Sequence, residues 1–180
     1  MPKKKGFMGT KRLIRKSSNK KVFCSSSAGV TEKIAVVLSK VLPKKGNVVI
    51  LFFGGLGYGK TTFIRGLVKG LGLNSGVASP TFKLVNVYKT RCRIVYHLDL
   101  YRLTTVDDVL SVGYEDIITS PHVVAIEWAE KFEDIYPKER IEVRLMYVSP
   151  EQRKVVVKTC GLMYNGLLTK LTSKLEVGKV

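Results

Sequence analysis

The chain has 180 residues, of which 45% are hydrophobic and 25% charged, so it can bury one core and is neither wholly disordered nor collagen-like. Its formal charge of +17 favours a polyanionic partner or serves solubility. No apolar run reaches the ~20 residues of a membrane helix, and three scattered cysteines indicate neither a disulfide framework nor a zinc knuckle, so we expect a cytoplasmic protein that does not span or contact a membrane.

Residues 1–27 are predicted to form a basic flexible tail ahead of one folded domain over residues 28–180. The tail holds nine Lys and Arg and no acid, which is too charged to pack. The excess of positive charge extends beyond the tail. Residues 1–98 carry a net charge of +19 with Glu32 as their only acid, whereas residues 99–180 carry −2. We expect the tail to contact RNA, with solubility or organellar targeting as the alternatives.

The folded domain is predicted to begin with a helix that Thr31 caps and that ends before Pro43. A continuous apolar run over 48–53 then predicts a strand buried on both faces, and a helix follows from about Lys60 to Leu71. Further strands are predicted over 83–88, 93–98, 123–126, 141–148 and 154–159, and helices near 106–110 and 162–175. This order predicts an α/β protein of P-loop NTPase type, with three layers and a mixed, mainly parallel central sheet.

A glycine-rich loop joins that strand to that helix and matches the phosphate-loop pattern G-x-x-x-x-G-K-[ST]. Glycines let successive N–H groups point at phosphate oxygens beside a helix N-terminus. Lys60 is expected to bridge the terminal phosphates of ATP, and the Thr61 hydroxyl to ligate Mg²⁺. The residues expected to contact the nucleotide are Gly54, Gly55, Leu56, Gly57, Tyr58, Gly59, Lys60, Thr61 and Thr62.

Two buried strands end in an acid, at Asp99 and at Glu127. Both carboxylates should reach the sheet edge that carries the phosphate loop, where one holds Mg²⁺ and the other orients a water molecule. Thr81, in Ser-Pro-Thr-Phe before the next strand, is expected to sense the terminal phosphate or reach Mg²⁺. The alternative is that Ser79-Pro80 forms an ordinary turn before that strand. His97 is interpreted as a hydrogen-bonded core residue.

With these residues in view, the chain resembles the TsaE (YjeE) family over roughly residues 30–160. The resemblance is carried by the phosphate loop and by four ordered segments: Ser79–Tyr88, Tyr96–Leu103, Gly113–Asp116 and Ile126–Trp128. The phosphate loop is generic, but its combination with His-x-Asp-x-Tyr-Arg and Glu-Trp is specific. Two positions depart from the family pattern, because Gly55 and Val87 stand where the family usually has acids.

The resemblance implies a partner-dependent ATPase that uses ATP and Mg²⁺ in threonylcarbamoyl modification of adenosine 37 in tRNAs that read A-starting codons. Its implied partners are the other two proteins of the bacterial-type transfer complex and tRNA, bound directly or through that complex. The resemblance also implies Thr61 and Glu127 as metal ligands, Asp99 as a second catalytic acid and Thr81 as a switch residue. Trp128 would pack beside the nucleotide or a partner protein, and Arg153 is a further candidate for contact with the nucleotide.

Two other functions remain open from the sequence. A small P-loop kinase would have a similar size and loop, although residues 100–120 hold only Arg102 and so offer no Arg-rich lid. A basic RNA-binding scaffold with a vestigial ATP site would explain the charge. The intact set of Lys60, Thr61, Asp99 and Glu127 argues against a vestigial site.

Overall fold

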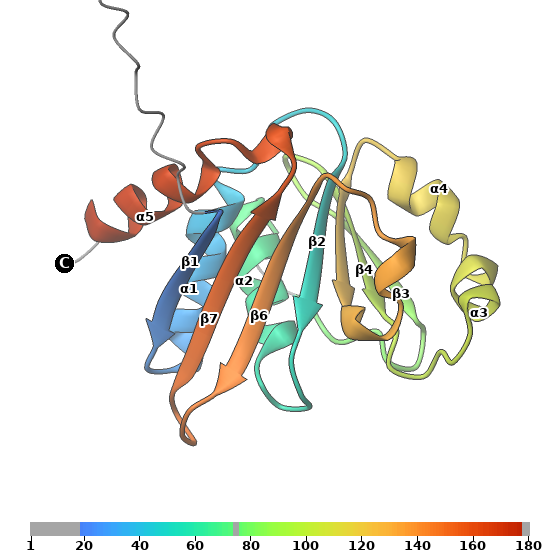
Figure 1. The fold of residues 1–180 in the computed structure, drawn as a ribbon, viewed down its shortest axis with the longest axis horizontal. Helices are drawn as coiled ribbons and strands as arrows, with labels where there is room; N and C mark the ends of the chain where they lie inside the picture. The colour runs from blue at the N-terminus through green and yellow to red at the C-terminus, as the bar shows by residue number, and fades with distance from the viewer. Residues whose placement is uncertain (1–18, 74–75, 178–180) are drawn as a thin grey trace, which may run out of the picture.

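The protein is built around one seven-stranded sheet, seen in a computed structural model that describes residues 19–73 and 76–177. Across the sheet the strands run in the order β1-β7-β6-β2-β5-β4-β3 (Figure 1). Their bounds are β1 (Lys20–Ser25), β2 (Val48–Phe53), β3 (Val85–Lys89), β4 (Ile94–Asp99), β5 (Val123–Glu127), β6 (Arg140–Tyr147) and β7 (Arg153–Cys160).

The four central strands β6, β2, β5 and β4 are mutually parallel. Strands β7 and β3 run antiparallel to them on the two sides, and β1 pairs antiparallel with β7 at the outer edge. All six residues of β2 are buried, as the apolar run predicts. Because β2, β4 and β5 are parallel, their carboxyl ends share one edge of the sheet and their amino ends share the opposite edge. We call these the carboxyl edge and the amino edge.

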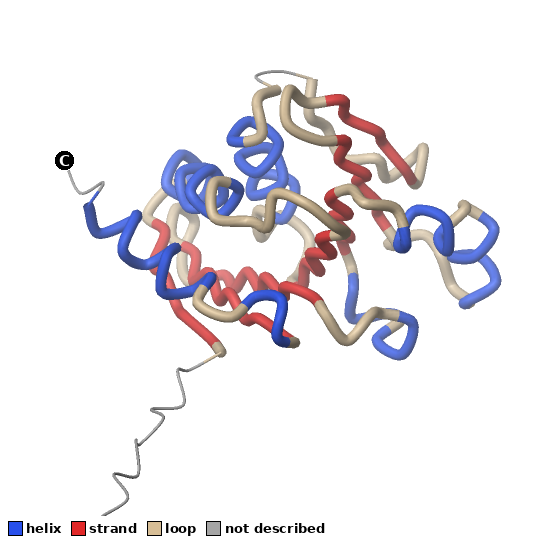
Figure 2. Tube along the Cα trace, turned by 90° about the horizontal axis from the view of Figure 1, so that it is seen from above, coloured by secondary structure: helices blue, strands red, loops and turns tan. Residues whose placement is uncertain are grey.

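Helices cover the two faces of the sheet unequally. The helices are α1 (Ala28–Ser39), α2 (Lys60–Gly70), α3 (Val106–Ser111), α4 (Tyr114–Thr119) and α5 (Leu167–Val177), with 3₁₀ turns η1 (Ala129–Lys131), η2 (Glu133–Ile135) and η3 (Leu162–Tyr164). One core lies between the sheet and α1, α2 and α5, and a second between β2, β4 and β5 and the segments α3, α4 and η1 (Figure 2). The predicted three-layer α/β class with a mixed sheet is therefore confirmed.

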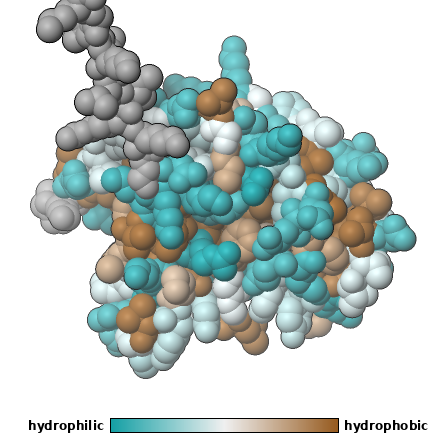
Figure 3. Space-filling model, in the orientation of Figure 1, coloured by the Kyte–Doolittle hydropathy of each residue, from teal (hydrophilic) through white to brown (hydrophobic). Residues whose placement is uncertain are grey.

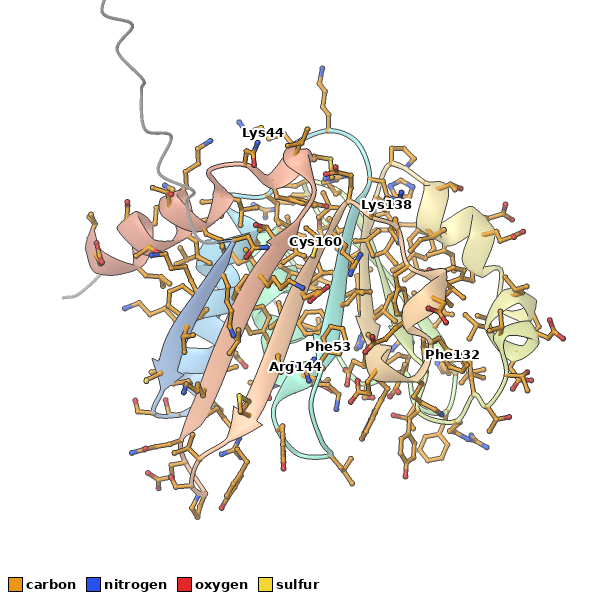
Figure 4. All side chains as sticks on the ribbon, in the orientation of Figure 1. Lys44, Phe53, Phe132, Lys138, Arg144 and Cys160 are labelled. Atoms are coloured by element: carbon orange, nitrogen blue, oxygen red, sulfur yellow. The ribbon has the colours of Figure 1, made fainter. Side chains whose placement is uncertain are left out.

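The second helical layer leaves β6, β7 and β1 open on the face turned to the viewer in Figure 1, where the surface is largely hydrophilic (Figure 3). At the border of this open face the Arg144 guanidinium lies 4.7 Å from the centre of the Phe53 ring (Figure 4). Phe53 is only 4% exposed. The long Arg144 side chain thus helps to shield the Phe53 ring from solvent at the border of the second core.

Helices α1 and α2 pack at close range behind the sheet. A Cβ atom at Gly66 of α2 would collide with the Glu32 carbonyl oxygen of α1 and lie 2.9 Å from the Ala35 Cβ, so glycine permits the approach. Arg65 of α2 also forms a 3.2 Å ion pair with Glu32. This contact fixes α2, whose first turn carries the phosphate loop, against the body of the domain.

The predicted boundary of the tail at residue 27 is wrong. Lys20–Ser25 form β1, which pairs antiparallel with β7, and Ser27, rather than Thr31, caps α1 by accepting a hydrogen bond from the Val30 N–H at 3.2 Å. Thr31 is buried instead and its hydroxyl lies 2.7 Å from that of Ser25. Residues 1–18 lie outside the described residues, so the tail prediction stands only for them.

The other predicted elements are present with shifts of a few residues, and three short ones were not predicted. The predicted C-terminal helix is divided into η3 and α5. The three elements without a prediction are α4, η1 and η2. Each of these three is six residues or fewer, too short for a periodic pattern to emerge. Within residues 19–73 and 76–177, no helix is long and apolar enough to cross a membrane.

Candidate functional site

The phosphate-loop residues surround a cavity at the carboxyl edge of the sheet. The cavity has a volume of about 390 Å³, and the loop from Leu56 to Thr62 lines one side of it. The remaining lining residues come from the loop before β3 and from the ends of β4 and β5: Ser79, Thr81, Asp99, Tyr101, Glu127 and Trp128. The fold thus brings four segments, far apart in sequence, to one place.

The loop leaves β2 through Gly54, whose φ of +131° is open to glycine alone. A Cβ atom there would also collide with the Leu145 carbonyl oxygen of β6. The Gly54 N–H donates a long, 3.4 Å hydrogen bond to Oε1 of Glu130, just after β5. The backbone path of the loop therefore depends on both neighbouring strands.

Lys60 begins α2 and is 4% exposed. Its ammonium group donates to the carbonyl oxygens of Gly54 at 2.6 Å and Gly55 at 3.0 Å, and it lies 3.8 Å above the Trp128 ring. Burial lowers the pKa of Lys60, while the charges of Glu127, Glu130 and Asp99 act in the opposite direction. Lys60 is thus a buried cation without a direct carboxylate partner among the described residues.

Glu127 ends β5 and connects the loop to the sheet interior. Its Oε1 accepts a hydrogen bond from the Thr61 hydroxyl at 2.8 Å and lies 2.9 Å from Nε2 of His97 on β4. Glu127 is 3% exposed, and His97 is fully buried. The His97 imidazole therefore fixes the same Glu127 oxygen that accepts the hydrogen bond from Thr61 in the first turn of α2.

Asp99 ends β4 directly beside Glu127, because the two residues are paired in the parallel register of β4 and β5. Its Oδ2 accepts hydrogen bonds from the hydroxyls of Ser79 at 2.9 Å and Thr81 at 2.5 Å, and its Oδ1 accepts one from the Tyr101 N–H at 3.0 Å. Two buried carboxylates thus stand side by side, one joined to the phosphate loop and the other to the Ser79–Thr81 segment.

Trp128 follows Glu127 with a φ of +61°, a left-handed conformation that costs a non-glycine residue roughly 1–2 kcal/mol. Its ring lies under Lys60 and 4.9 Å from the Tyr101 ring. The contacts of its ring with Lys60 and Tyr101 hold Trp128 in this strained backbone conformation. Such strain is typical of functional sites, where it fixes the direction of a side chain.

Arg153 lies outside this group. With Gly57, Tyr58, Gly59 and Thr62 it lines a neighbouring cavity of about 530 Å³, on the side of the loop that faces the start of α1. Its guanidinium stacks 4.9 Å from the Tyr147 ring and donates to the Gly57 carbonyl at 3.5 Å. Arg153 therefore borders the loop but does not line the cavity of the two carboxylates.

Sequence reasoning missed two residues of this site and understated others. Glu130 and Tyr101 were not singled out, and Ser79 and His97 were treated as a turn residue and a core residue. Glu130 lies one turn after Glu127, and Tyr101 lies two residues after Asp99. Closeness in sequence to an acid that ends a strand is therefore the sequence signal that could have pointed to Glu130 and Tyr101 as site residues.

The two departures from the family pattern have different surroundings. At Gly55 a Cβ atom would lie 3.1–3.3 Å from the Tyr58 ring, so that ring occupies the space an acid would need. Val87 is 50% exposed on β3, at the far side of the sheet. The first departure therefore lies within the phosphate loop, against the Tyr58 ring, and the second lies at a residue that does not line the cavity.

Comparison with known proteins identifies the family. The family model "Threonylcarbamoyl adenosine biosynthesis protein TsaE" matches residues 25–155. Proteins named tRNA threonylcarbamoyladenosine biosynthesis protein TsaE are similar to this chain in Treponema pallidum (35% identity over 74% of this chain and 96% of that protein) and in Nostoc sp. (41% over 71% and 78%). The crystal structure of Bacillus subtilis YdiB shares the fold, with a TM-score of 0.71 and 24% identity over 86% of this chain and 95% of that one. The chain therefore belongs to the TsaE family.

Proposed function

We propose that this protein is a Mg²⁺-dependent ATPase whose nucleotide cycle serves threonylcarbamoyl modification of adenosine 37 in tRNAs that read A-starting codons. Membership of the TsaE family supports the pathway. The observation that carries the ATPase assignment is the pairing of Asp99 with Glu127 beside Lys60 and Thr61. A phosphate loop alone binds nucleotide, whereas hydrolysis also needs carboxylates near the transferred phosphoryl group.

Lys60 is the group we assign to the phosphates. In the structure its ammonium donates to two carbonyl oxygens of its own loop, Gly54 and Gly55. These are neutral acceptors, and phosphate oxygens form stronger charge-assisted hydrogen bonds with the same cation. The backbone N–H groups at the start of α2 add donors to the same anion site.

The donor set suits Mg²⁺. Thr61 Oγ1 and the Glu127 carboxylate are hard oxygen ligands 2.8 Å apart, and Mg²⁺ typically takes one or two protein oxygens together with substrate phosphates and water. The ion would neutralise charge that develops on the phosphates. His97, bonded to the same Glu127 oxygen, keeps that carboxylate turned toward Thr61.

We assign Asp99 to the attacking water. Its carboxylate already accepts two hydroxyl hydrogen bonds, from Ser79 and Thr81, so a buried acceptor lies at the cavity wall. An aspartate in this position orients a water molecule and accepts hydrogen bonds from it during attack. Thr81 would contact the terminal phosphate and so couple its presence to the position of the segment that carries Phe82.

Partner activation is supported by apolar side chains around the cavity mouth. Leu56 is 82% exposed, Phe82 89% and Tyr101 51%. Exposed apolar residues that cluster around a site are typical of a surface that another protein covers. The partners we propose are the two other proteins of the transfer complex, with tRNA bound directly or through it. We place the reaction in the cytoplasm, where the free thiols of Cys24, Cys92 and Cys160 are stable.

Release of inorganic phosphate from ATP tests the proposal. The full-length chain is assayed alone, with the two partner proteins, and with tRNA. Glu127→Gln and Asp99→Asn should retain nucleotide binding but lose about 100-fold or more of the hydrolysis rate, the size of effect expected for groups that stabilise the transition state. Glu133→Gln, which changes an exposed acid of η2, is the matched control and should hydrolyse ATP at the parental rate.

Two results would contradict the proposal. Parental hydrolysis by both Glu127→Gln and Asp99→Asn would show that these carboxylates are structural. ADP formation without inorganic phosphate, with the phosphoryl group found on an acceptor, would identify a kinase instead.

A further inference from the structure

Another cavity, separate from the two described above, lies at the amino edge of the sheet, where β2, β4 and β5 begin. Its volume is about 510 Å³, and three loops line it, 44–46, 90–93 and 121–122. They bring four permanent cations and one histidine together: Lys44, Lys45, Arg91, Arg93 and His122. We call these five residues the amino-edge cluster; Figure 4 shows Lys44 at this upper end of the molecule.

Arg93 connects the three loops. Its guanidinium donates hydrogen bonds to the Pro43 and Pro121 carbonyl oxygens, each at 2.9 Å, and to that of Gly46. The Thr90 hydroxyl closes the 90–93 loop by accepting from the Arg93 N–H at 2.9 Å. The Val48 N–H also donates to the His122 carbonyl at 2.9 Å. The cavity is therefore held by specific bonds between segments that are distant in sequence.

The other cations of the cluster are uncompensated. Lys44, Lys45 and Arg91 are exposed, and in the described parts of the chain their side chains make no hydrogen bond or ion pair. Among the residues that the structure describes, no carboxylate lines the cavity. Elsewhere the protein does pair its cations, as in the contacts of Arg65 with Glu32 and of Lys158 with Glu142.

We propose that the amino-edge cluster binds the phosphodiester backbone of RNA, which in the proposed function is the tRNA substrate. Lys and Arg side chains supply most protein contacts to nucleic-acid phosphates. The cluster also lies in the part of the chain that carries +19 with Glu32 as its only acid. Four cations converging on one cavity therefore suit a polyanion.

The surroundings favour RNA over an acidic protein surface. Protein interfaces have an apolar centre, but no large hydrophobic side chain in the three described loops is exposed. The carboxyl edge differs, because Leu56, Phe82 and Tyr101 are exposed there. An edge with cations and no apolar anchor suits electrostatic binding to phosphates.

The position of the cluster allows RNA and nucleotide to bind together. β2 has six residues, and at about 3.3 Å per residue the two edges lie roughly 20 Å apart. RNA on the amino-edge cluster therefore leaves the carboxyl-edge cavity open. Saturating ATP should not displace RNA from the protein.

The test compares two triple variants of the full-length chain that remove the same charge. Lys44→Gln/Lys45→Gln/Arg91→Gln changes the cluster but keeps Arg93 and its loop contacts. Lys154→Gln/Lys170→Gln/Lys174→Gln removes three exposed cations from β7 and α5. Each protein is titrated with a tRNA transcript that reads an A-starting codon, at several salt concentrations between about 50 and 200 mM.

We expect the cluster variant to bind tRNA roughly tenfold more weakly and to lower the log–log salt slope by about 2, since each phosphate contact contributes about 0.7–0.9. The control variant should change affinity less than about twofold. Parental thermal unfolding and parental ATP binding by the cluster variant would show that the effect is confined to RNA.

Three results would overturn the inference. Equal losses in both variants would assign the effect to net charge, and unchanged tRNA affinity in the cluster variant would remove the site. Normal tRNA binding with lost assembly onto the partner proteins would make the amino edge a protein interface. Failure of the ATPase proposal is a separate outcome, because it appears in phosphate release and leaves the tRNA titration interpretable.

Discussion

The two edges formed by the same parallel strands differ in the sign of their charges and in how far those charges are buried. At the carboxyl edge, Asp99 and Glu127 are buried, and hydroxyls, an N–H group and an imidazole hold their oxygens. At the amino edge, Lys44, Lys45 and Arg91 are exposed to solvent, and the described residues that line their cavity include no carboxylate. The carboxyl edge therefore holds its charges in a fixed hydrogen-bond network, whereas the amino edge exposes its charges to solvent.

This difference indicates what each edge is suited to contact. Preorganised, desolvated groups interact strongly with charge that develops at one point, as in phosphoryl transfer. Solvated cations bind weakly one at a time, but together they attract a chain of phosphates and respond to salt. Of the four predictions below, which begin with the largest expected effect, the first three test this contrast and the fourth concerns a helix cap outside both cavities.

Lys60→Ala removes the one buried cation from the carboxyl-edge cavity. Each charge-assisted hydrogen bond to phosphate is worth about 1.5–3 kcal/mol, so the Kd for MgATP should rise at least about 100-fold. Isothermal titration calorimetry measures it, with Lys69→Ala on the exposed side of α2 as the control. Unchanged affinity in a folded Lys60→Ala protein would remove the phosphate-loop assignment.

Arg93→Ala should destabilise the fold, because the carbonyl oxygens of Pro43, Gly46 and Pro121 lose a shared donor. We expect the free energy of unfolding to fall by about 2 kcal/mol, as measured by urea denaturation. Arg91→Ala, two residues away and exposed, should change it by less than about 0.5 kcal/mol. Equal effects would mean that Arg93 does not connect the loops.

Deleting residues 1–18 tests whether RNA affinity resides in the tail as well as in the amino-edge cluster. This segment holds seven Lys and Arg and no acid. Its loss should weaken tRNA binding, flatten the salt slope by about 0.7 for each lost contact on single strands, and leave ATP binding unchanged. Identical salt slopes for the two proteins would assign the tail to solubility or targeting. The deletion must stop at residue 18, because cutting to residue 26 would remove β1.

Asp108, in the first turn of α3, provides the smallest effect and lines neither of the two edge cavities. Its carboxylate accepts hydrogen bonds from the Thr104 and Thr105 N–H groups, both at 2.9 Å, and these lower its pKa from 3.8 to about 2. Because the pKa is lowered in the folded state, the capping contribution to α3 is present above about pH 4 and is lost as the pH falls toward 2.

An NMR titration of the Asp108 carboxyl group checks this value. Asp108→Asn should remove that part of the acid dependence of unfolding, and Asp107→Asn, whose side chain makes no hydrogen bond within the described structure, should not. Neither variant should alter ATP or tRNA binding. A titration midpoint near 4 for Asp108 would show that the capping bonds do not form in solution.

The carboxyl edge was largely predictable because its signals are local. The strand-loop-helix order around Lys60 and the acids that end two apolar runs are each readable within a few residues. Parallel pairing then forces Asp99 and Glu127 together. The hydrogen bonds of Glu130 and Tyr101 were not predictable, since they depend on the path of the chain after the strands end.

The amino-edge cluster and β1 were not predictable for a different reason. The sequence shows a basic half with Glu32 as its single acid, but only the order of strands in the sheet brings Lys44, Arg91 and His122 to one cavity. β1 has a mostly exposed, lysine-containing sequence that reads as tail. Its structure comes from pairing with β7, a long-range contact that no local pattern records.

That pairing also sets an order of events during synthesis. β1 leaves the ribosome before every other strand, yet its partner is β7, the last strand to be made. At roughly 5–20 residues per second, β1 waits on the order of ten seconds for its partner, while the strands between them can already pair. The side of the sheet next to β6 therefore stays open until β7 emerges, and the nascent chain exposes a strand edge during that interval.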